Sequence, residues 1–359
     1  MNNTKSIALI NKYRGQIMGF SALWVIVYHT WYRLAVPETS PKLLYYIELA
    51  ISKMGYFGVD IFFLLSGIGL SYAIVRHGTK QYLLRRFRRL AYPVLIAAAI
   101  QAIMDGWSFP HYLLAVSGIG FFIKYRPLHI FFLWFISAIT ATYLLFPIYW
   151  RFFSRSRSKP RFTALFIVAW YLCSIPMLKV FRPVVFMAIT RVPTFVLGVL
   201  LGWQQQNGGL KLSRRTFNTA ALLSAAVGIP LGWLAAIHNI SFFRFLPNGF
   251  IPGILVAFGL TTLLAELFGL LDRAGRATRA INKFFGFYGK MSLDLYCTHE
   301  YIAPILVQAL WNAGIVGLAV NLIEIAVFTL AGWLLHIIAD RATRLTDRLI
   351  SSAKTARQL

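Results

Sequence analysis

Ionisable side chains inside apolar segments are the first candidates for chemistry in this sequence. His29 lies near the end of the apolar run FSALWVIVYHTWYR, Asp60 lies within FGVDIFFLLSG, and His299 and Glu300 lie within a third run. An aspartate at the centre of a bilayer costs roughly 2.5–3.5 kcal/mol, so such groups are usually retained for a function. When depth in the membrane is counted along each helix at about 1.5 Å per residue, these groups are predicted to lie in one layer, in the middle to outer leaflet. An imidazole near a carboxylate can take a proton from a hydroxyl group, which predicts acid–base catalysis.

Four arginines form a second candidate site. Arg85, Arg86, Arg88 and Arg89 lie within YLLRRFRRLAYP, where a predicted helix leaves the membrane. On a helix, Arg85, Arg88 and Arg89 share one face. Basic residues at a cytoplasmic helix end anchor the helix, but four within five residues exceed that need. Because a guanidinium binds phosphate oxygens bidentately, the run predicts a site for a phosphorylated ligand from the cytoplasm.

The elements that must position these groups are predicted transmembrane helices. The chain has 359 residues, of which 58% are hydrophobic and only 13% charged, whereas soluble domains average about 25% charged residues. A transmembrane helix needs about 20 mostly apolar residues. Ten runs come close to this requirement, at residues 16–34, 55–75, 90–105, 129–150, 162–179, 182–203, 217–237, 249–271, 287–309 and 315–339. The predicted fold class is therefore all-α, a polytopic membrane helix bundle.

The distribution of positive charge predicts the orientation of this bundle. The net charge is +25, and 27 of the 36 lysines and arginines lie on alternate connecting segments. By the positive-inside rule, these segments and both termini are predicted to be cytoplasmic. Topology and contact with anionic membrane lipids then account for the charge, and nucleic acid is not an expected partner. We expect one transmembrane domain over residues 1–340 and a basic cytoplasmic tail over residues 341–359.

Four further residues in apolar runs receive no chemical role. Cys173 and Cys297 lack the spacing of a disulfide framework or a metal site, so no metal is expected. Glu266 and Glu324 are also inside predicted spans, where a hydrogen bond to a neighbouring helix would explain each of them.

Five segments of the chain resemble the acyltransferase-3 family of membrane O-acyltransferases. They are FSALWVIVYH, GYFGVDIFFLLSG, RRFRRLAYP, LWFISAITATYLLFP and GKMSLDLYCTHEY, in the order and spacing of that family. The resemblance implies transfer of an acyl group, most often acetyl, from cytoplasmic acyl-coenzyme A to a hydroxyl of a cell-envelope glycan or glycolipid. It also implies a bacterial plasma membrane location and acyl-coenzyme A as donor co-substrate, with no permanently bound cofactor.

The resemblance implies a role for each residue that matches a family motif. The catalytic residues would be His29 and Asp60. The arginine run, which contains the family's R-x-x-R pair twice, would bind the donor. The remaining matched positions would bind substrate: Ser66, Trp134, Ser292, Asp294, Tyr296 and His299.

Two positions depart from the family pattern. The family's basic residue eleven positions before the histidine is Met18 here, so Arg14, roughly one turn lower on the helix, is predicted to serve the donor instead. The family's glutamate five positions after the tryptophan is Ile139 here, which predicts a different acceptor.

The expected mechanism joins these residues in one reaction. The diphosphate of coenzyme A docks on the arginine run, the thioester reaches His29, and Asp60 orients the imidazole. Direct attack by the acceptor and transfer through an acyl-histidine are both compatible with the sequence. A proton-coupled exporter of a sugar or lipid would also carry buried Asp and His residues. A third interpretation is a structural or lipid-sensing protein, whose polar groups only join helices. The oligomeric state is left open.

Overall fold

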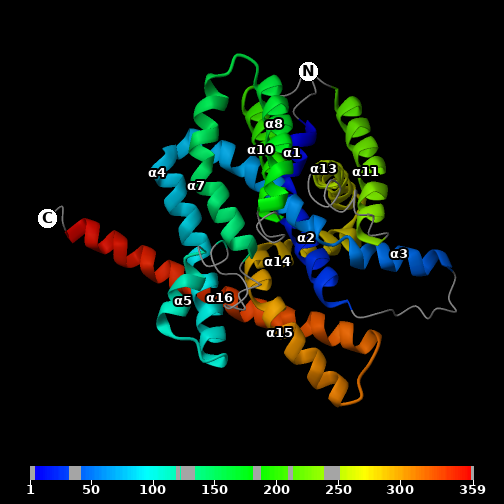
Figure 1. The fold of residues 1–359 in the computed structure, drawn as a ribbon, viewed down its shortest axis with the longest axis vertical. Helices are drawn as coiled ribbons and strands as arrows, with labels where there is room; N and C mark the ends of the chain where they lie inside the picture. Colours follow the sequence, from blue (N-terminus) through cyan, green and yellow to red (C-terminus); the bar gives the residue numbers. More distant parts are fainter. Residues whose placement is uncertain are drawn as a thin grey trace. The chain divides into compact units, whose positions relative to one another are not determined.

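A computed structural model describes residues 5–31, 42–118, 122, 134–180, 187–208, 213–237 and 251–356 of the chain (Figure 1). All regular structure in these residues is helical, with no strand among them, which confirms the predicted all-α class. The chain divides into two compact units. Unit 1 contains Met1–Tyr82 and Ala141–Lys290, and unit 2 contains Leu83–Thr140 and Met291–Leu359.

Unit 1 is built from helices of the N-terminal and central parts of the chain. They are α1 (Lys5–Lys12), α2 (Arg14–Thr30), α3 (Lys42–Lys53), α8 (Lys159–Val180), α10 (Val192–Gln206), α11 (Arg214–Ile237), α13 (Ile251–Ala274) and α14 (Arg276–Lys290), with the first part of α4 (Phe57–Met104) and the end of α7 (Trp134–Arg155). Its core contains fully buried side chains from α2, α4 and α13, among them Ile17, Leu64 and Phe268.

Glycines set the closest helix contacts of unit 1. A Cβ atom added at Gly19 of α2 would overlap the Phe285 carbonyl oxygen of α14, and one added at Gly289 of α14 would overlap the carbonyl oxygen of Gly15. Gly198 of α10 meets the backbone of α4 at Leu64 in the same way. Because no side chain separates these backbones, the helices approach more closely than larger residues would allow. The helix that carries His29 is therefore held directly against α14, beside which it lies in Figure 1.

Unit 2 is built around the pair α15 (Ser292–Asn312) and α16 (Leu318–Ala356), with the second part of α4, the short α5 (Phe109–Val116) and the start of α7. Gly332 of α16 packs on Leu295 of α15, and the ring of Phe328 lies 6.4 Å from that of His299. From Leu295 to His299 along α15, the contacting residue on α16 changes from Gly332 back to Phe328. The two helices therefore run antiparallel.

Gly78 interrupts α4 close to the junction of the two units. Its φ of 68° lies in the left-handed region, which glycine adopts without the steric cost of a side chain. Residues before and after it are regular helix, so α4 consists of two helical segments joined at this residue. The sequence predicted two spans here, at 55–75 and 90–105.

Six helices in the described part of the chain are long and apolar enough to cross a membrane. They lie at Phe57–Met104, Lys159–Met177, Met187–Gln206, Arg214–Ala236, Ile251–Ala274 and Leu318–Arg348. A multi-pass membrane protein is therefore supported, while the number of ten spans and the cytoplasmic termini stay predictions. α16 continues without a break through residues 341–356. These residues belong to the predicted basic cytoplasmic tail, whose location stays a prediction.

Candidate active site

His29 occupies the last turn of α2 in unit 1 and is partly exposed. Its ring lies 5.0 Å from the ring of Tyr28, which in turn lies 5.6 Å from the ring of Tyr56 just before α4. An imidazole at a helix end that is neither fully buried nor fully exposed can exchange protons with a bound substrate. This position suits the predicted role of His29, which stays a prediction.

Asp60 lies in the first turn of α4 and is almost completely buried. Its Oδ2 atom lies 3.7 Å from Nη2 of Arg191, which is also buried. Among the described residues, Oδ1 has no hydrogen-bond partner, and it faces Gly253 of α13, where an added Cβ would lie 2.7 Å from it. The observed charge partner of Asp60 is therefore Arg191, and the expected contact with His29 stays a prediction.

Arg191 is the residue of this site that the sequence argument missed. It is held by the Met187 carbonyl oxygen at 3.1 Å and the Thr190 hydroxyl at 2.9 Å, in addition to Asp60. Its position inside the apolar run 182–203 could have identified it from the sequence. An unpaired guanidinium in the membrane would be as costly as an unpaired aspartate.

Ser66 and Arg14 are also in unit 1. Ser66 is half-buried on α4, next to Gly67, which packs against the backbone of α10. Arg14 is the first residue of α2 and is partly exposed. Met18, one turn after Arg14, packs against the core of unit 1, so its position in the structure is that of an apolar packing residue.

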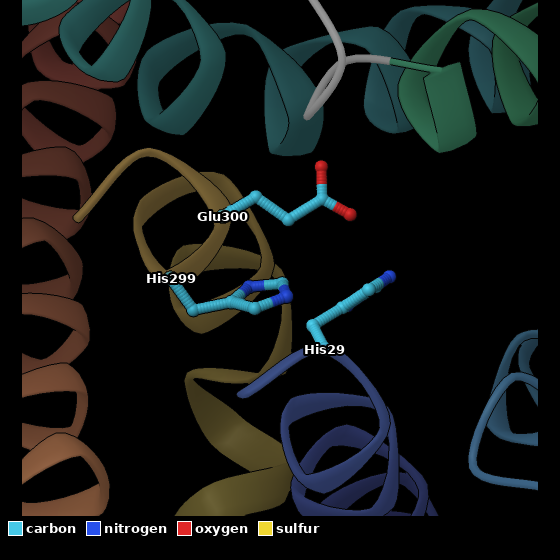
Figure 2. Close-up of side chains that lie close together, drawn as sticks. All are labelled: His29, His299 and Glu300. Carbon is cyan, nitrogen blue, oxygen red and sulfur yellow. The ribbon is translucent and has the colours of Figure 1, made fainter. Parts of the chain in front are cut away.

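In unit 2, the four predicted site residues of the ninth span, Ser292, Asp294, Tyr296 and His299, all lie on α15. Tyr296 accepts a hydrogen bond through its hydroxyl from the backbone N–H of Phe135 at 3.1 Å, next to the buried Trp134 at the start of α7. Nδ1 of His299 lies 2.9 Å from the Leu295 carbonyl oxygen. Because a carbonyl oxygen can only accept, Nδ1 is the donor in this hydrogen bond. Figure 2 shows His299 and Glu300 as successive residues of α15, and His29 at the end of α2.

Ser292 and Asp294 begin α15, and both are buried. Asp294 binds His336 of α16, with 2.9 Å between Oδ2 and Nδ1. This carboxylate–imidazole pair is a second feature that the sequence did not predict, because it joins residues 42 positions apart on two helices.

The arginine run lies on α4 within unit 2. Arg85 and Arg89 are exposed, and Arg86 and Arg88 are partly buried. Arg88 forms an ion pair with Asp347 of α16, with 3.2 Å between Nη1 and Oδ1. The charge of Arg88 is therefore partly compensated by Asp347, and the binding of a donor by the arginine run stays a prediction.

Glu266 and Glu324, which the sequence left without a role, differ in the structure. Glu266 pairs with Arg214 and accepts a hydrogen bond from Asn218 at 2.8 Å, so it joins α13 to α11. Glu324 is fully buried in unit 2, and neither carboxylate oxygen has a hydrogen-bond partner among the described residues.

The comparisons with known proteins identify the family. The model of a family described as an acyltransferase domain matches residues 18–339, which contain every predicted site residue except Arg14. No curated protein and no solved structure matched the chain. Because the family model covers most of the sequence, the chain belongs to the acyltransferase-3 family.

Proposed function

We propose that this membrane acyltransferase moves an acyl group, most often acetyl, from cytoplasmic acyl-coenzyme A to a hydroxyl of a cell-envelope glycan or glycolipid. The observation that carries the proposal is the family match over residues 18–339. The ionisable groups on α2, α4 and α15 supply the acid–base chemistry that such a transfer requires.

His29 is the proposed catalytic base. The acceptor oxygen attacks the thioester carbon while the imidazole takes the hydroxyl proton, and a tetrahedral intermediate forms. The carbon–sulfur bond then breaks, the thiolate takes the proton from the imidazolium, and free coenzyme A leaves. The partial exposure of His29 at the end of α2 supports this role, because a base must reach its substrate.

The arginines of α4 are the proposed binding site for the phosphates of the donor. Arg85 and Arg89 are exposed, and Arg86 is partly so. Arg88 also pairs with Asp347. We expect all four guanidinium groups to contribute to donor affinity through charge-assisted hydrogen bonds to phosphate oxygens. His29 belongs to unit 1 and the arginines to unit 2, so a path for the pantetheine arm between them stays a prediction.

The proposed setting is the plasma membrane of a bacterium, with ten spans and both termini in the cytoplasm. The break in α4 at Gly78 supports counting this helix as two spans. The basic residues near this break and at the end of α16 support a cytoplasmic location for these segments.

The test measures acyl transfer in membranes from cells that lack the native protein and express a variant. Labelled acetyl-coenzyme A is added, and alkali-labile label in the glycan and glycolipid fractions is counted. His29→Ala should abolish transfer without lowering the amount of protein in the membrane. His77→Ala, at a partly exposed histidine of α4, is the matched control and should transfer normally. Transfer by His29→Ala at close to the normal rate would contradict the assignment of the base.

A further inference from the structure

One exposed face of α14 changes from basic to aromatic along the length of the helix. Arg276, Arg279 and Lys283 are exposed on its first half. Phe284 and Phe287 are 50% and 42% exposed on its second half. At 3.6 residues per turn, the three basic residues fall within an arc of about 60°, and Phe287 follows Lys283 one turn later on the same face. Positive charge and apolar surface therefore follow one another along one side of α14.

The opposite face of α14 packs against other helices of unit 1. The side-chain amide of Asn282 donates a hydrogen bond to the Phe268 carbonyl oxygen of α13 at 3.0 Å, and the ring of Phe285 lies 5.5 Å from the ring of Phe268. Gly289 meets the backbone of α2 at Gly15. The basic and aromatic face therefore points away from the helices that hold α14 in place.

The positive charge of this face is not compensated by acidic groups. α14 contains no aspartate or glutamate. Within the part of the chain that the structure describes, no ion pair includes Arg276, Arg279 or Lys283. The acidic residue that precedes α14 most closely along the chain is Asp272, which accepts hydrogen bonds from Lys12 and Tyr13 instead. The face therefore presents three positive charges to an anion.

The chain places α14 at the boundary of the membrane. α13, which precedes it, is one of the helices long and apolar enough to cross a bilayer. The predicted ninth span, residues 287–309, begins in the last turn of α14 and continues along α15. With 15 residues, α14 is about 22 Å long and is too short to cross the hydrocarbon core by itself. Basic residues followed by aromatic rings where a span begins are typical of the zone between headgroups and hydrocarbon.

We propose that this face of α14 binds an anionic phospholipid. Its phosphodiester headgroup contacts Arg276, Arg279 and Lys283, and one of its acyl chains packs on Phe284 and Phe287. Guanidinium and ammonium groups form charge-assisted hydrogen bonds with phosphate oxygens, and each basic residue near the surface adds attraction for anionic lipids. The aromatic half favours a lipid over a soluble phosphate, which has no apolar group to bury there. The site goes beyond the proposed function and depends on neither its donor nor its acceptor.

The test measures lipid binding to the full chain in detergent micelles by native mass spectrometry. Phosphatidylglycerol and phosphatidylcholine with identical acyl chains are titrated separately, and the ratio of their affinities is determined. The wild type should prefer phosphatidylglycerol at least about tenfold, because each basic residue near the headgroup adds up to about fivefold. The variant Arg276→Gln/Arg279→Gln/Lys283→Gln should lose most of this preference.

The matched control is Arg155→Gln/Arg157→Gln/Arg161→Gln, which removes three exposed positive charges around the connection between α7 and α8. It should keep a ratio close to the wild-type value. Equal binding of the two lipids by the wild type would overturn the proposal. A normal ratio in the α14 variant, or an equal reduction by the control, would overturn it as well, because binding would then not depend on this face.

Two further measurements test the aromatic half of the face. Phe284→Ser/Phe287→Ser should weaken the binding of both lipids by a similar factor and leave their ratio unchanged, because the two lipids have the same acyl chains. Glycerol phosphate, which has a phosphate group but no acyl chain, should not displace phosphatidylglycerol at equal concentration. Normal lipid affinity in the phenylalanine variant, or displacement by glycerol phosphate, would assign a soluble phosphate to this face and overturn the lipid site.

Discussion

The buried ion pair between Asp60 and Arg191 makes a quantitative prediction. Both side chains are at most 4% exposed, and 3.7 Å separates Nη2 from Oδ2. At an effective dielectric constant of about 20, this separation corresponds to an attraction of about 4.5 kcal/mol. Arg191→Met leaves the aspartate charge buried without its partner and should lower the free energy of unfolding by about 3–5 kcal/mol.

The second variant in this experiment removes the remaining charge. Adding Asp60→Asn to Arg191→Met takes away the uncompensated carboxylate, so the double variant should recover at least half of the lost stability. The assay is unfolding by SDS in mixed micelles, followed by tryptophan fluorescence. Lys12→Met serves as the control, because Lys12 and its partner Asp272 are exposed, and it should change the unfolding curve little.

Additive effects of the two substitutions would refute this reasoning, because an electrostatic pair must show coupling. The double variant also has a functional use. If it is stable but inactive, at least one of the two residues has a role in the reaction beyond balancing the charge of the other. If it is stable and active, the pair only maintains the fold.

Two further predictions concern buried groups. Gly253→Ala places a methyl group 2.7 Å from Oδ1 of Asp60 and should lower the thermal unfolding temperature, whereas Gly15→Ala, which has open space for a Cβ, should not lower it through overlap. Equal unfolding temperatures for the two variants would contradict the observed packing. Glu324→Leu should raise the unfolding temperature, because it replaces a fully buried carboxylate that lacks hydrogen bonds in the described part of unit 2. A loss of stability in this variant would contradict this reasoning.

The sequence predicted the helical class well, because apolar runs long enough for a membrane leave few alternatives to helices. It also identified Asp60 as a costly group from its position inside such a run, and Asp294 from its match to a family motif. It did not predict their partners, Arg191 and His336. Each partner lies on another helix, and which helices pack together depends on side-chain fit along their whole lengths.

The conformation of Gly78 in α4 and the ion pair of Arg88 are two further features that the sequence could not predict. The sequence predicted two spans around Gly78, but the left-handed conformation of this glycine follows from the path of the chain on either side. Arg88 looked equivalent to its three neighbours in the run, and nothing in the sequence indicated its ion pair with Asp347 on another helix. Local patterns therefore predict which groups need partners, while tertiary packing decides what those partners are.

The glycine contacts between α2 and α14 have a mechanical consequence. At Gly15, Gly19 and Gly289 the two backbones meet with no flexible side chain between them to absorb a displacement. A force on α14, which carries basic residues and exposed aromatic rings, is therefore transmitted to α2 as a rigid-body movement. The end of α2 that carries His29 is therefore expected to move together with α14 rather than independently of it.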